Sequence, residues 1–394
     1  MNDCCIVGGG IIGLSLAREL AGRGMTVRLL ARGRGADTTS WAAAGIFPPA
    51  PMHAGISPAD ALTAWSDTLH RTWSKDLEAE TGIDNGLLPS GGLHLARSAA
   101  GVERLRADAG RWREKGTAAD LLDAQEVMAC EPALASGDDA GAILTGMLLR
   151  DEMQFRPSRH LDALEASCRS RGVVIEEADV RQFVIQGTRV ERAVTATGEI
   201  AAGAWVLAAG SWTGGLANAF GIALDTRPIR GQIVLLRLPR PVITRIVNRG
   251  LDYLVQRPDG RLLVGSTIED IGFDCTTTPD TVERLEGVAR ALLGELPGSV
   301  FERSWAGLRP GTADGRPTIG RLPDLDNVYI SAGHFRAGLH QSTGSAVLLA
   351  DLMTARPTHL DASAFAPGRA APPAGTIPAG STADYLARTV AAID

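Results

Sequence analysis

Three glycines near the start of the sequence have the spacing of a phosphate-binding turn. Gly8, Gly10 and Gly13 fall in the pattern G-x-G-x-x-G. In this pattern the first glycine permits a tight turn, the second lets the backbone approach a pyrophosphate, and the third lets a helix pack closely on a strand. The amides at the helix start, those of Ile11 and Ile12, would face the phosphates. The spacing therefore predicts a dinucleotide site.

The residue that should bind the ribose of this dinucleotide is not acidic. An Asp or Glu about 20 positions after the turn usually accepts a hydrogen bond from a ribose hydroxyl. Ala31 occupies that place, and Arg32 and Arg34 follow it. Arginines here can bind a 2′-phosphate instead, so an NADP-dependent reductase is an alternative. The other interpretation is that these two arginines belong to a solvated loop.

Two arginines in glycine-bearing turns are candidates for binding a carboxylate. Arg309 lies in Gly-Leu-Arg-Pro and Arg336 in Gly-His-Phe-Arg. A guanidinium matches the planar carboxylate with two parallel hydrogen bonds, which an ammonium cannot do. Tyr253 begins a strand-like run and could donate to the same carboxylate. The alternatives are an ordinary surface or structural role for each arginine and a half-buried sheet position for the tyrosine.

The elements expected around the glycine turn form a strand–helix–strand unit. Cys4–Val7 and Thr26–Leu30 are short apolar runs, and apolar residues recur at helical spacing over Ile11–Arg23. This is the context that the glycine pattern requires.

The rest of the chain alternates between helical patterns and strand-rich blocks. The expected helices cover residues 59–81, 101–116, 158–171, 280–296 and 338–353. The expected strand regions are 145–156, 173–195, 205–210, 226–266 and 328–331. A dinucleotide fold thus opens the chain, is interrupted by a strand-rich block, and resumes near the C-terminus. Residues 355–382 are rich in Ala, Pro, Gly and Thr and are interpreted as an extended or mobile tail.

Three further stretches carry a family resemblance. Small residues follow the second strand in Thr39–Gly45, and Gly-Leu-Arg-Pro within residues 306–317 precedes Gly-His-Phe-Arg within 333–338. Together with the glycine turn, they resemble the glycine oxidase branch of the D-amino-acid oxidase family of FAD enzymes. The resemblance covers about residues 3–354.

The resemblance implies an α/β fold, α+β overall, with two domains. One is a Rossmann-like FAD-binding domain that is discontinuous in sequence, and the other is a substrate domain of mainly antiparallel sheet with helices. We expect the FAD-binding domain at residues 1–80, 145–220 and 300–354, the substrate domain at 81–144 and 221–299, and a C-terminal tail at 355–394.

The resemblance also implies the residues of the site. Arg309, Arg336 and Tyr253 would bind the substrate. The implied FAD contacts are Gly8, Gly10, Ile11, Ile12, Gly13, Ala31, Arg32, Thr39, Ser40, Ala44, Gly45, Ile46, Val180, Gly210, His334, Phe335, Arg336, Ala337, Gly338, Leu339 and His340. Related sarcosine oxidases tether FAD through a cysteine in the C-terminal part of the chain. No cysteine follows Cys275 here, so we expect noncovalent FAD.

The implied activity is the oxidative deamination of glycine or another small amino acid, such as sarcosine or a small D-amino acid. Hydride transfer from Cα to flavin would yield, after hydrolysis, a 2-oxo acid and ammonia, with hydrogen peroxide formed when oxygen is the acceptor. A neutral amine needs no side-chain base, so no catalytic side chain is expected. The product could feed thiazole synthesis for thiamine. The alternatives are a D-amino-acid dehydrogenase that uses a quinone or another acceptor, the NADP-dependent reductase, and a non-catalytic flavin-binding protein.

The turn around Arg336 departs from the family pattern. Ala337 follows Arg336 where Asn is common, and residues 338–342 are less apolar than in glycine oxidases. These residues would lie near the reactive edge of the flavin, so the sequence leaves the preferred amino acid open.

The composition narrows the class of protein. The chain has 394 residues, 45% of them hydrophobic, and a net charge of −6, which argues against a nucleic-acid or anionic-membrane surface. Its five cysteines and seven histidines show no metal-ligand spacing, and no apolar run approaches a membrane span. We expect a cytoplasmic protein without metal. A homo-oligomer is left open.

Overall fold

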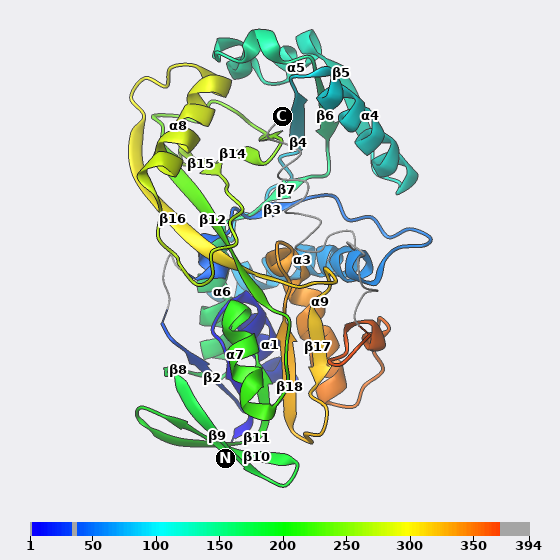
Figure 1. Cartoon of the computed structure of the whole chain (residues 1–394), viewed down its shortest axis with the longest axis vertical. Coiled ribbons are helices and arrows are strands. Elements are labelled where there is room, and N and C mark those ends of the chain that lie inside the picture. The colour runs from blue at the N-terminus through cyan, green and yellow to red at the C-terminus, as the bar shows by residue number, and fades with distance from the viewer. Residues whose placement is uncertain (1, 34–37, 371–394) are drawn as a thin grey trace.

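The computed structural model describes residues 2–33 and 38–370. Within these residues the strands form two large sheets and a short ladder between β3 (Ile46–Phe47) and β7 (Met153–Gln154). Figure 1 shows one sheet in the lower half of the molecule and the other in the upper half, with the long strands β12 and β16 running between them.

The first sheet has a parallel core that begins with the N-terminus. Its strand order is β17-β18-β11-β1-β2-β8, and only β17 in this path is antiparallel to its neighbour. The bounds are β1 (Asn2–Val7), β2 (Val27–Ala31), β8 (Val174–Glu177), β11 (Gly198–Leu207), β17 (Thr318–Arg321) and β18 (Val328–Ala332). The glycine turn follows β1 at the carboxyl edge of this sheet, which is where α/β sheets bind ligands.

Both faces of this sheet are buried, which explains the unbroken apolar run in β1. Cys4 and Ile6 pack against helices, whereas Cys5 and Val7 pack on the opposite face. The helical layer consists of α1 (Ile11–Gly22), α3 (Pro58–Thr81), α6 (Pro157–Ser170) and α9 (Gly338–Met353). The opposite face is covered by β9 (Val180–Gln186), β10 (Arg189–Thr195) and α7 (Thr213–Ala217).

Helices α3 and α9 cross at small residues. The hydroxyl of Ser66 accepts a hydrogen bond of 3.1 Å from the amide of Gly344, and a Cβ atom at Gly344 would overlap that hydroxyl. The close crossing buries the first turns of α9, which begins beside the candidate site.

The second sheet is mainly antiparallel and has the order β16-β12-β15-β14-β13-β4-β6-β5. Its strands are β4 (Gly92–Ala96), β5 (Ala119–Asp123), β6 (Thr145–Leu149), β12 (Arg227–Arg237), β13 (Ile246–Arg249), β14 (Asp252–Gln256), β15 (Arg261–Gly265) and β16 (Val300–Gly311). Three helices pack around it, α4 (Ala99–Glu114), α5 (Ala124–Cys130) and α8 (Pro279–Leu293).

The two faces of the second sheet have different partners. Alternate residues such as Val234, Leu254 and Val264 pack under α8. Their sequence neighbours Ile233 and Tyr253 lie on the other face, toward the first sheet. The alternation of side chains along each strand therefore gives this sheet one core face and one face for a site.

The predicted α/β class and the opening strand–helix–strand unit are confirmed. Strands β6 and β16 lie in the second sheet, whereas residues 145–149 and 300–311 were assigned to the FAD-binding domain. The limits of the two domains stay predictions. The expected helix over 280–296 ends at Leu293, where Gly294 adopts a φ of 71°.

Part of the expected tail is folded. Residues 362–365 form a 3₁₀ turn, and Phe365 is buried in the core beneath α9. Arg369 forms an ion pair of 2.7 Å with Asp314. The prediction of an extended or mobile segment is therefore wrong for residues 355–370, while 371–394 lie outside the described residues. Among the helices that the structure describes, none is long and apolar enough to cross a membrane.

Candidate active site

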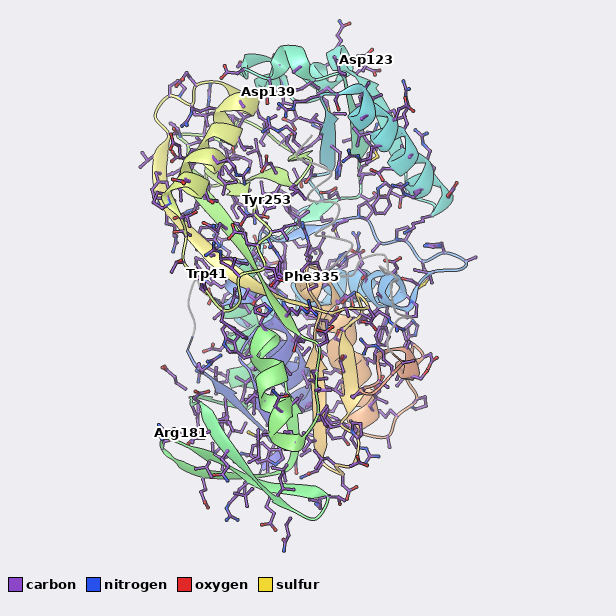
Figure 2. The ribbon with its side chains drawn as sticks, viewed as in Figure 1. Trp41, Asp123, Asp139, Arg181, Tyr253 and Phe335 are labelled. Carbon is purple, nitrogen blue, oxygen red and sulfur yellow. The ribbon has the colours of Figure 1, made fainter. Side chains whose placement is uncertain are left out.

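A large cavity lies where the two sheets meet. It contains about 1790 Å³ of space free of protein atoms, open solvent included. The turn after β1, the segment around α2 (Thr39–Ala42), strands β12, β14 and β16, and the turn before α9 line it. Figure 2 shows Trp41, Tyr253 and Phe335 in this middle zone of the molecule.

Most of the residues expected at the site line this one cavity. They are Gly8, Gly10, Ile11, Ile12, Ala31, Arg32, Thr39, Ser40, Ala44, Gly45, Ile46, Gly210, Tyr253, Arg309, His334, Phe335, Arg336, Gly338, Leu339 and His340. Gly13, Val180 and Ala337 do not line it. Gly13 lies beneath the turn, and Val180 is buried at the start of β9.

The glycine turn forms a backbone cradle. Gly8 has a φ of 127°, and a Cβ atom there would overlap the carbonyl of Ala208. A Cβ atom at Gly13 would overlap the carbonyl of Gly8, so the helix could not pack so closely on the turn. Gly10 caps α1 without a side-chain hydrogen bond, and the hydroxyl of Ser40 accepts one of 2.9 Å from the amide of Ile11. This arrangement fits a pyrophosphate at the positive end of the helix.

The segment Thr39–Gly45, which begins with α2, is fastened to the second sheet. The hydroxyl of Thr39 donates to the carbonyl of Leu308, and the indole of Trp305 donates to the carbonyl of Ala42 over 3.0 Å. Trp41 and Trp305 meet edge to face at 5.3 Å. Because both ends of the segment are held, its small residues line the cavity in a fixed position.

A buried arginine anchors the end of this segment. The guanidinium of Arg257 donates to the carbonyl of Ala44 over 2.6 Å and to the side chain of Gln154 over 2.7 Å. Burial lowers the pKa of Arg257 to about 9, so the group is still charged at neutral pH. Arg257 is thus a buried cation that holds backbone at the wall of the cavity.

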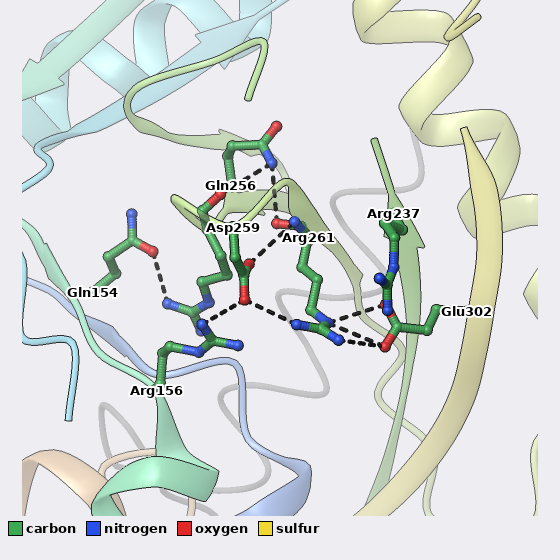
Figure 3. A network of polar contacts seen from close by, with 8 residues as sticks. Gln154, Arg156, Arg237, Gln256, Asp259, Arg261 and Glu302 are labelled. Carbon is green, nitrogen blue, oxygen red and sulfur yellow. Dashed lines mark hydrogen bonds and ion pairs between the residues drawn. The ribbon is translucent and has the colours of Figure 1, made fainter. Parts of the chain in front are cut away.

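The charges of Arg156 and Asp259 act on Arg257, and Figure 3 shows these two residues in a network with Arg261 and Glu302. Asp259 forms ion pairs of 2.7 Å with Arg156 and 2.9 Å with Arg261, and Arg261 also pairs with Glu302 at 2.9 Å. Partial burial raises the pKa of Asp259, but the hydrogen bonds from Arg156 and Arg261 and the charge of Arg156 together outweigh it, and the pKa falls to about 2. Asp259 is therefore ionised and offsets part of the positive charge.

Arg309 is held against β12 by backbone and hydroxyl acceptors. Its Nη1 donates to the carbonyls of Thr267 at 3.1 Å and Arg230 at 3.3 Å, and its Nη2 donates to the hydroxyl of Ser266 at 3.1 Å. The guanidinium lies over Gly231, where a Cβ atom would overlap it. The position of this cation is therefore set by the protein.

Tyr253 lies beside the two arginines. Its ring covers Gly265, its strand neighbour on β15, where a Cβ atom would overlap the ring. Burial raises the pKa of Tyr253, and the charges of Arg309 and Arg336 oppose this only in part. The phenol therefore stays protonated and can donate a hydrogen bond.

Strand β16, which carries Arg309, is joined to the turn that carries Arg336. The expectation that Arg309 lies in a turn is wrong, because this residue pairs with Ile229 of β12. The amide of Phe335 donates to the carbonyl of Pro310 over 2.9 Å. Phe335 has a φ of 45°, which is uncommon for a residue with a side chain and is held here by the buried surroundings. Arg309, in β16, and Arg336, in the turn before α9, thus reach the same cavity from neighbouring segments.

The two histidines of the cavity wall are bonded to protein groups. His334 lies 3.0 Å from the hydroxyl of Ser345, and burial lowers its pKa to about 3. His340 lies 3.0 Å from the carboxylate of Asp67 and stacks on Phe47 at 4.2 Å. His334 is therefore neutral at ordinary pH, which suits a lining group.

Arg32 lies at the far end of the cavity. Its guanidinium sits 4.6 Å from the ring of Trp212 and 3.9 Å from the carboxylate of Asp179. Arg34, which could bind a 2′-phosphate, lies outside the described residues. In the chain that the structure describes, no group of three or more His, Cys, Asp or Glu is arranged to bind a metal ion.

Some residues that shape the cavity, without contacting a ligand through reactive groups of their own, were not predicted from the sequence. Gly231 and Gly265 leave room for Arg309 and Tyr253, and Arg257 and Trp305 hold the Thr39–Gly45 segment. Glycine inside a strand often marks a close approach of another group, so the roles of Gly231 and Gly265 could have been predicted from the sequence. No sequence pattern indicates the roles of Arg257 and Trp305.

Comparisons with known proteins agree on one family. The profile described as FAD dependent oxidoreductase matches residues 3–352. Glycine oxidase of Pseudomonas aeruginosa is 34% identical over 365 residues, which covers 92% of this chain and 97% of that protein. The crystal structure of glycine oxidase from Geobacillus kaustophilus has a TM-score of 0.87 and 29% identity, covering 94% of this chain and 99% of that one.

A longer relative carries the same unit. The bifunctional protein ThiO/ThiG of Synechocystis is 31% identical over 375 residues, which covers 93% of this chain but 54% of that protein. Sequences similar to this chain therefore occur both as proteins of about the same length and as one part of a larger protein.

Proposed function

The chain belongs to the family of FAD dependent oxidoreductases, and we propose that it is an amino-acid oxidase that acts on glycine or another small amino acid. The observation that carries the proposal is the fixed guanidinium of Arg309, in the same cavity as the glycine turn. A carboxylate bound there would direct the rest of a small amino acid along the cavity.

FAD, when bound, supplies the acceptor for a hydride from Cα of the amino acid. The cradle of Gly8 and Gly10, with the amide of Ile12 and the Ser40 hydroxyl that accepts from Ile11, would hold its pyrophosphate. The Thr39–Ile46 segment and residues 334–340, all but Ala337 on the cavity wall, would hold the ring system. No covalent link is proposed, because the sequence has no cysteine after Cys275.

Three side chains would bind and orient the substrate. Arg309 would accept the carboxylate as a bidentate partner, Tyr253 would donate to it from its protonated phenol, and Arg336 would add a second positive charge. Fixing the carboxylate aims the Cα–H bond, and such orientation accounts for much of the rate of a reaction between bound groups.

No side chain needs to remove a proton from a substrate that binds as a neutral amine. His334 is buried and neutral, and its ring is bonded to Ser345. We therefore assign His334 and His340 to the lining of the cofactor site. The bulk of Phe335 and Trp41 would exclude water from the reacting atoms.

We propose oxygen as the electron acceptor, so that hydrogen peroxide forms together with a 2-oxo acid and ammonia. The relatives named glycine oxidase support this acceptor over a quinone. The likeness to the protein named ThiO/ThiG supports a role of the product in thiazole synthesis for thiamine. A cytoplasmic location and a homo-oligomer stay predictions.

The decisive experiment is anaerobic mixing of the purified protein with glycine, sarcosine, D-alanine and L-alanine. We expect a yellow protein whose flavin absorbance is bleached fastest by glycine or another small amino acid, and peroxide in stoichiometric amounts when air is admitted. Turnover with a quinone or dye but not with oxygen would identify a dehydrogenase. A colourless protein that binds NADP would overturn the proposal.

A further inference from the structure

The ribose site lacks its usual acid at the end of β2, but the neighbouring strand supplies one. Strands β2 and β8 are parallel, and Ala31 pairs with Glu177. Residues paired across adjacent strands project from the same face, about 4.8 Å apart. The side chain of Glu177 therefore lies one strand away from the place where the missing carboxylate would be.

A hollow connects this carboxylate to the glycine turn. It contains about 520 Å³ of space free of protein atoms, open solvent included, and its lining includes Gly9, Ala31, Gly33, Glu176 and Glu177. Gly9, Ala31 and Gly33 also line the main cavity, so the two spaces meet at the end of β2. A Cβ atom at Gly33 would lie 3.6 Å from Oε1 of Glu177, which places the carboxylate beside the chain that follows β2.

The neighbouring acids are already paired, whereas Glu177 has no ion-pair partner among the described residues. Glu176 projects from the opposite face and lies 3.7 Å from Arg28, and Asp179 lies 3.9 Å from Arg32. Among the residues that the structure describes, no arginine, lysine or histidine forms an ion pair with Glu177. Its carboxylate is therefore available to accept hydrogen bonds from a ligand.

We propose that Glu177 is the ribose-binding acid of this protein, accepting hydrogen bonds from the ribose hydroxyls of the adenosine half of FAD. The inference rests on the FAD site proposed above. A carboxylate at this place also repels a 2′-phosphate, because two anions would lie side by side. The same residue thus favours FAD over NADP although Ala31 is not acidic.

The test is the dissociation constant of FAD for the apoprotein, measured by quenching of flavin fluorescence. A hydrogen bond to a charged group is worth enough that Glu177→Gln should raise the Kd by about 10-fold to 100-fold. Glu176→Gln is the matched control, since it neutralises the adjacent carboxylate on the other face, and its Kd should stay within about 2-fold of the original protein. Circular dichroism of both variants checks the fold.

A second variant distinguishes a specific contact from a general loss of charge. Ala31→Glu restores an acid at the end of β2, so in the Glu177→Gln background it should recover most of the lost affinity. An unchanged Kd for Glu177→Gln, or an equal loss in Glu176→Gln, would overturn this proposal without touching the proposed function. Absence of FAD binding by the original protein would instead overturn the function itself.

Discussion

Arg309 is oriented before any substrate arrives, because three protein oxygens already accept hydrogen bonds from its guanidinium. A side chain with this many rotatable bonds would otherwise lose considerable conformational entropy on binding. Holding it in the free protein removes that cost from the binding step. The position of the guanidinium is thus set by the carbonyls of Arg230 and Thr267 and by the hydroxyl of Ser266.

Replacing Arg309 should damage catalysis far more than cofactor binding. For Arg309→Ala we expect kcat/KM for glycine to fall about 10-fold to 100-fold, on the order of 1.4–2.8 kcal/mol, with FAD content unchanged. Arg309→Lys should recover only part of the loss, because a point charge cannot reproduce the planar fork. Steady-state oxygen consumption with each variant measures this.

An amine without a carboxylate provides the control for Arg309→Ala, since its slow oxidation should be nearly unaffected. If Arg309→Ala oxidises glycine with the original kcat/KM, the carboxylate is bound elsewhere, and Arg336 becomes the candidate.

We expect Gly231 to affect catalysis only through the position of the Arg309 guanidinium. A Cβ atom at Gly231 would displace the guanidinium, so Gly231→Ala should lower kcat/KM for glycine by at least about 10-fold, since a misplacement of 1 Å can cost this much. Gly215→Ala is the matched control, because no atom lies within 4 Å of its added Cβ. Equal kinetics for the two variants would refute this account of Arg309.

At the scale of elements, the crossing of α3 and α9 fixes the turn that carries Arg336. The amide of Gly344 bonds to Ser66 of α3, and His70 of α3 lies 3.0 Å from the carbonyls of Leu339 and His340. The start of α9 is therefore tied to α3 at two places. Any change that separates these helices moves the cavity wall.

Two helical glycines should respond to alanine in opposite ways. Gly344→Ala forces α3 and α9 apart, so the free energy of unfolding should fall by about 1–3 kcal/mol. Gly287→Ala, within α8 and with no atom within 4 Å, should instead raise it by roughly 0.5–1 kcal/mol. Urea unfolding of the holoprotein, followed by circular dichroism, gives both values. A loss for Gly287→Ala equal to that for Gly344→Ala would contradict the crossing as the cause.

Elements with a local pattern could be predicted from the sequence, and those defined by distant pairing could not. An apolar run predicts β1, and the glycine turn followed by apolar residues at helical spacing predicts α1. Residues 145–149 and 300–311 were assigned to the FAD-binding domain, because nothing in the residues of β6 and β16 reveals that these strands pair with β5 and β12. Phe365 lies in a stretch of small residues and prolines, so its burial depends on a partner that the local sequence does not show.

The residues that would contact the ligand could be predicted from the sequence, but the residues that hold them in position could not. Glycines, arginines and a tyrosine with recognisable neighbours were found because each has a role at the ligand. Arg257 and the glycines at 231 and 265 act on other residues across strands, so their importance appears only in three dimensions.

On the scale of the whole molecule, buried histidines make stability depend on pH. Burial lowers the pKa of His70 and of His334 to about 3. In the unfolded chain both titrate near 6.5, so below that pH the unfolded state binds more protons than the folded state. The stability present above pH 6.5 is therefore lost as the pH falls toward 3.

We expect the free energy of unfolding to decrease by about 1.4 kcal/mol per pH unit for each of these histidines between pH 6 and pH 4. His334→Asn removes one of the two groups and should reduce the slope accordingly, whatever its effect on stability at pH 7. Urea titrations at a series of pH values measure the slope. A slope identical in His334→Asn and the original protein would show that His334 does not contribute.

The strand order of the first sheet sets when the protein can fold during its synthesis. β1 leaves the ribosome first, yet its neighbour β11 spans residues 198–207, and β18, which completes the parallel core, spans 328–332. Until β11 has been translated, the apolar strand Cys4–Val7 has only β2 beside it among the described strands of this sheet. Contacts so distant in sequence form slowly, and exposed strand edges aggregate. The nascent chain should therefore depend on chaperones until β11 and β18 have been translated.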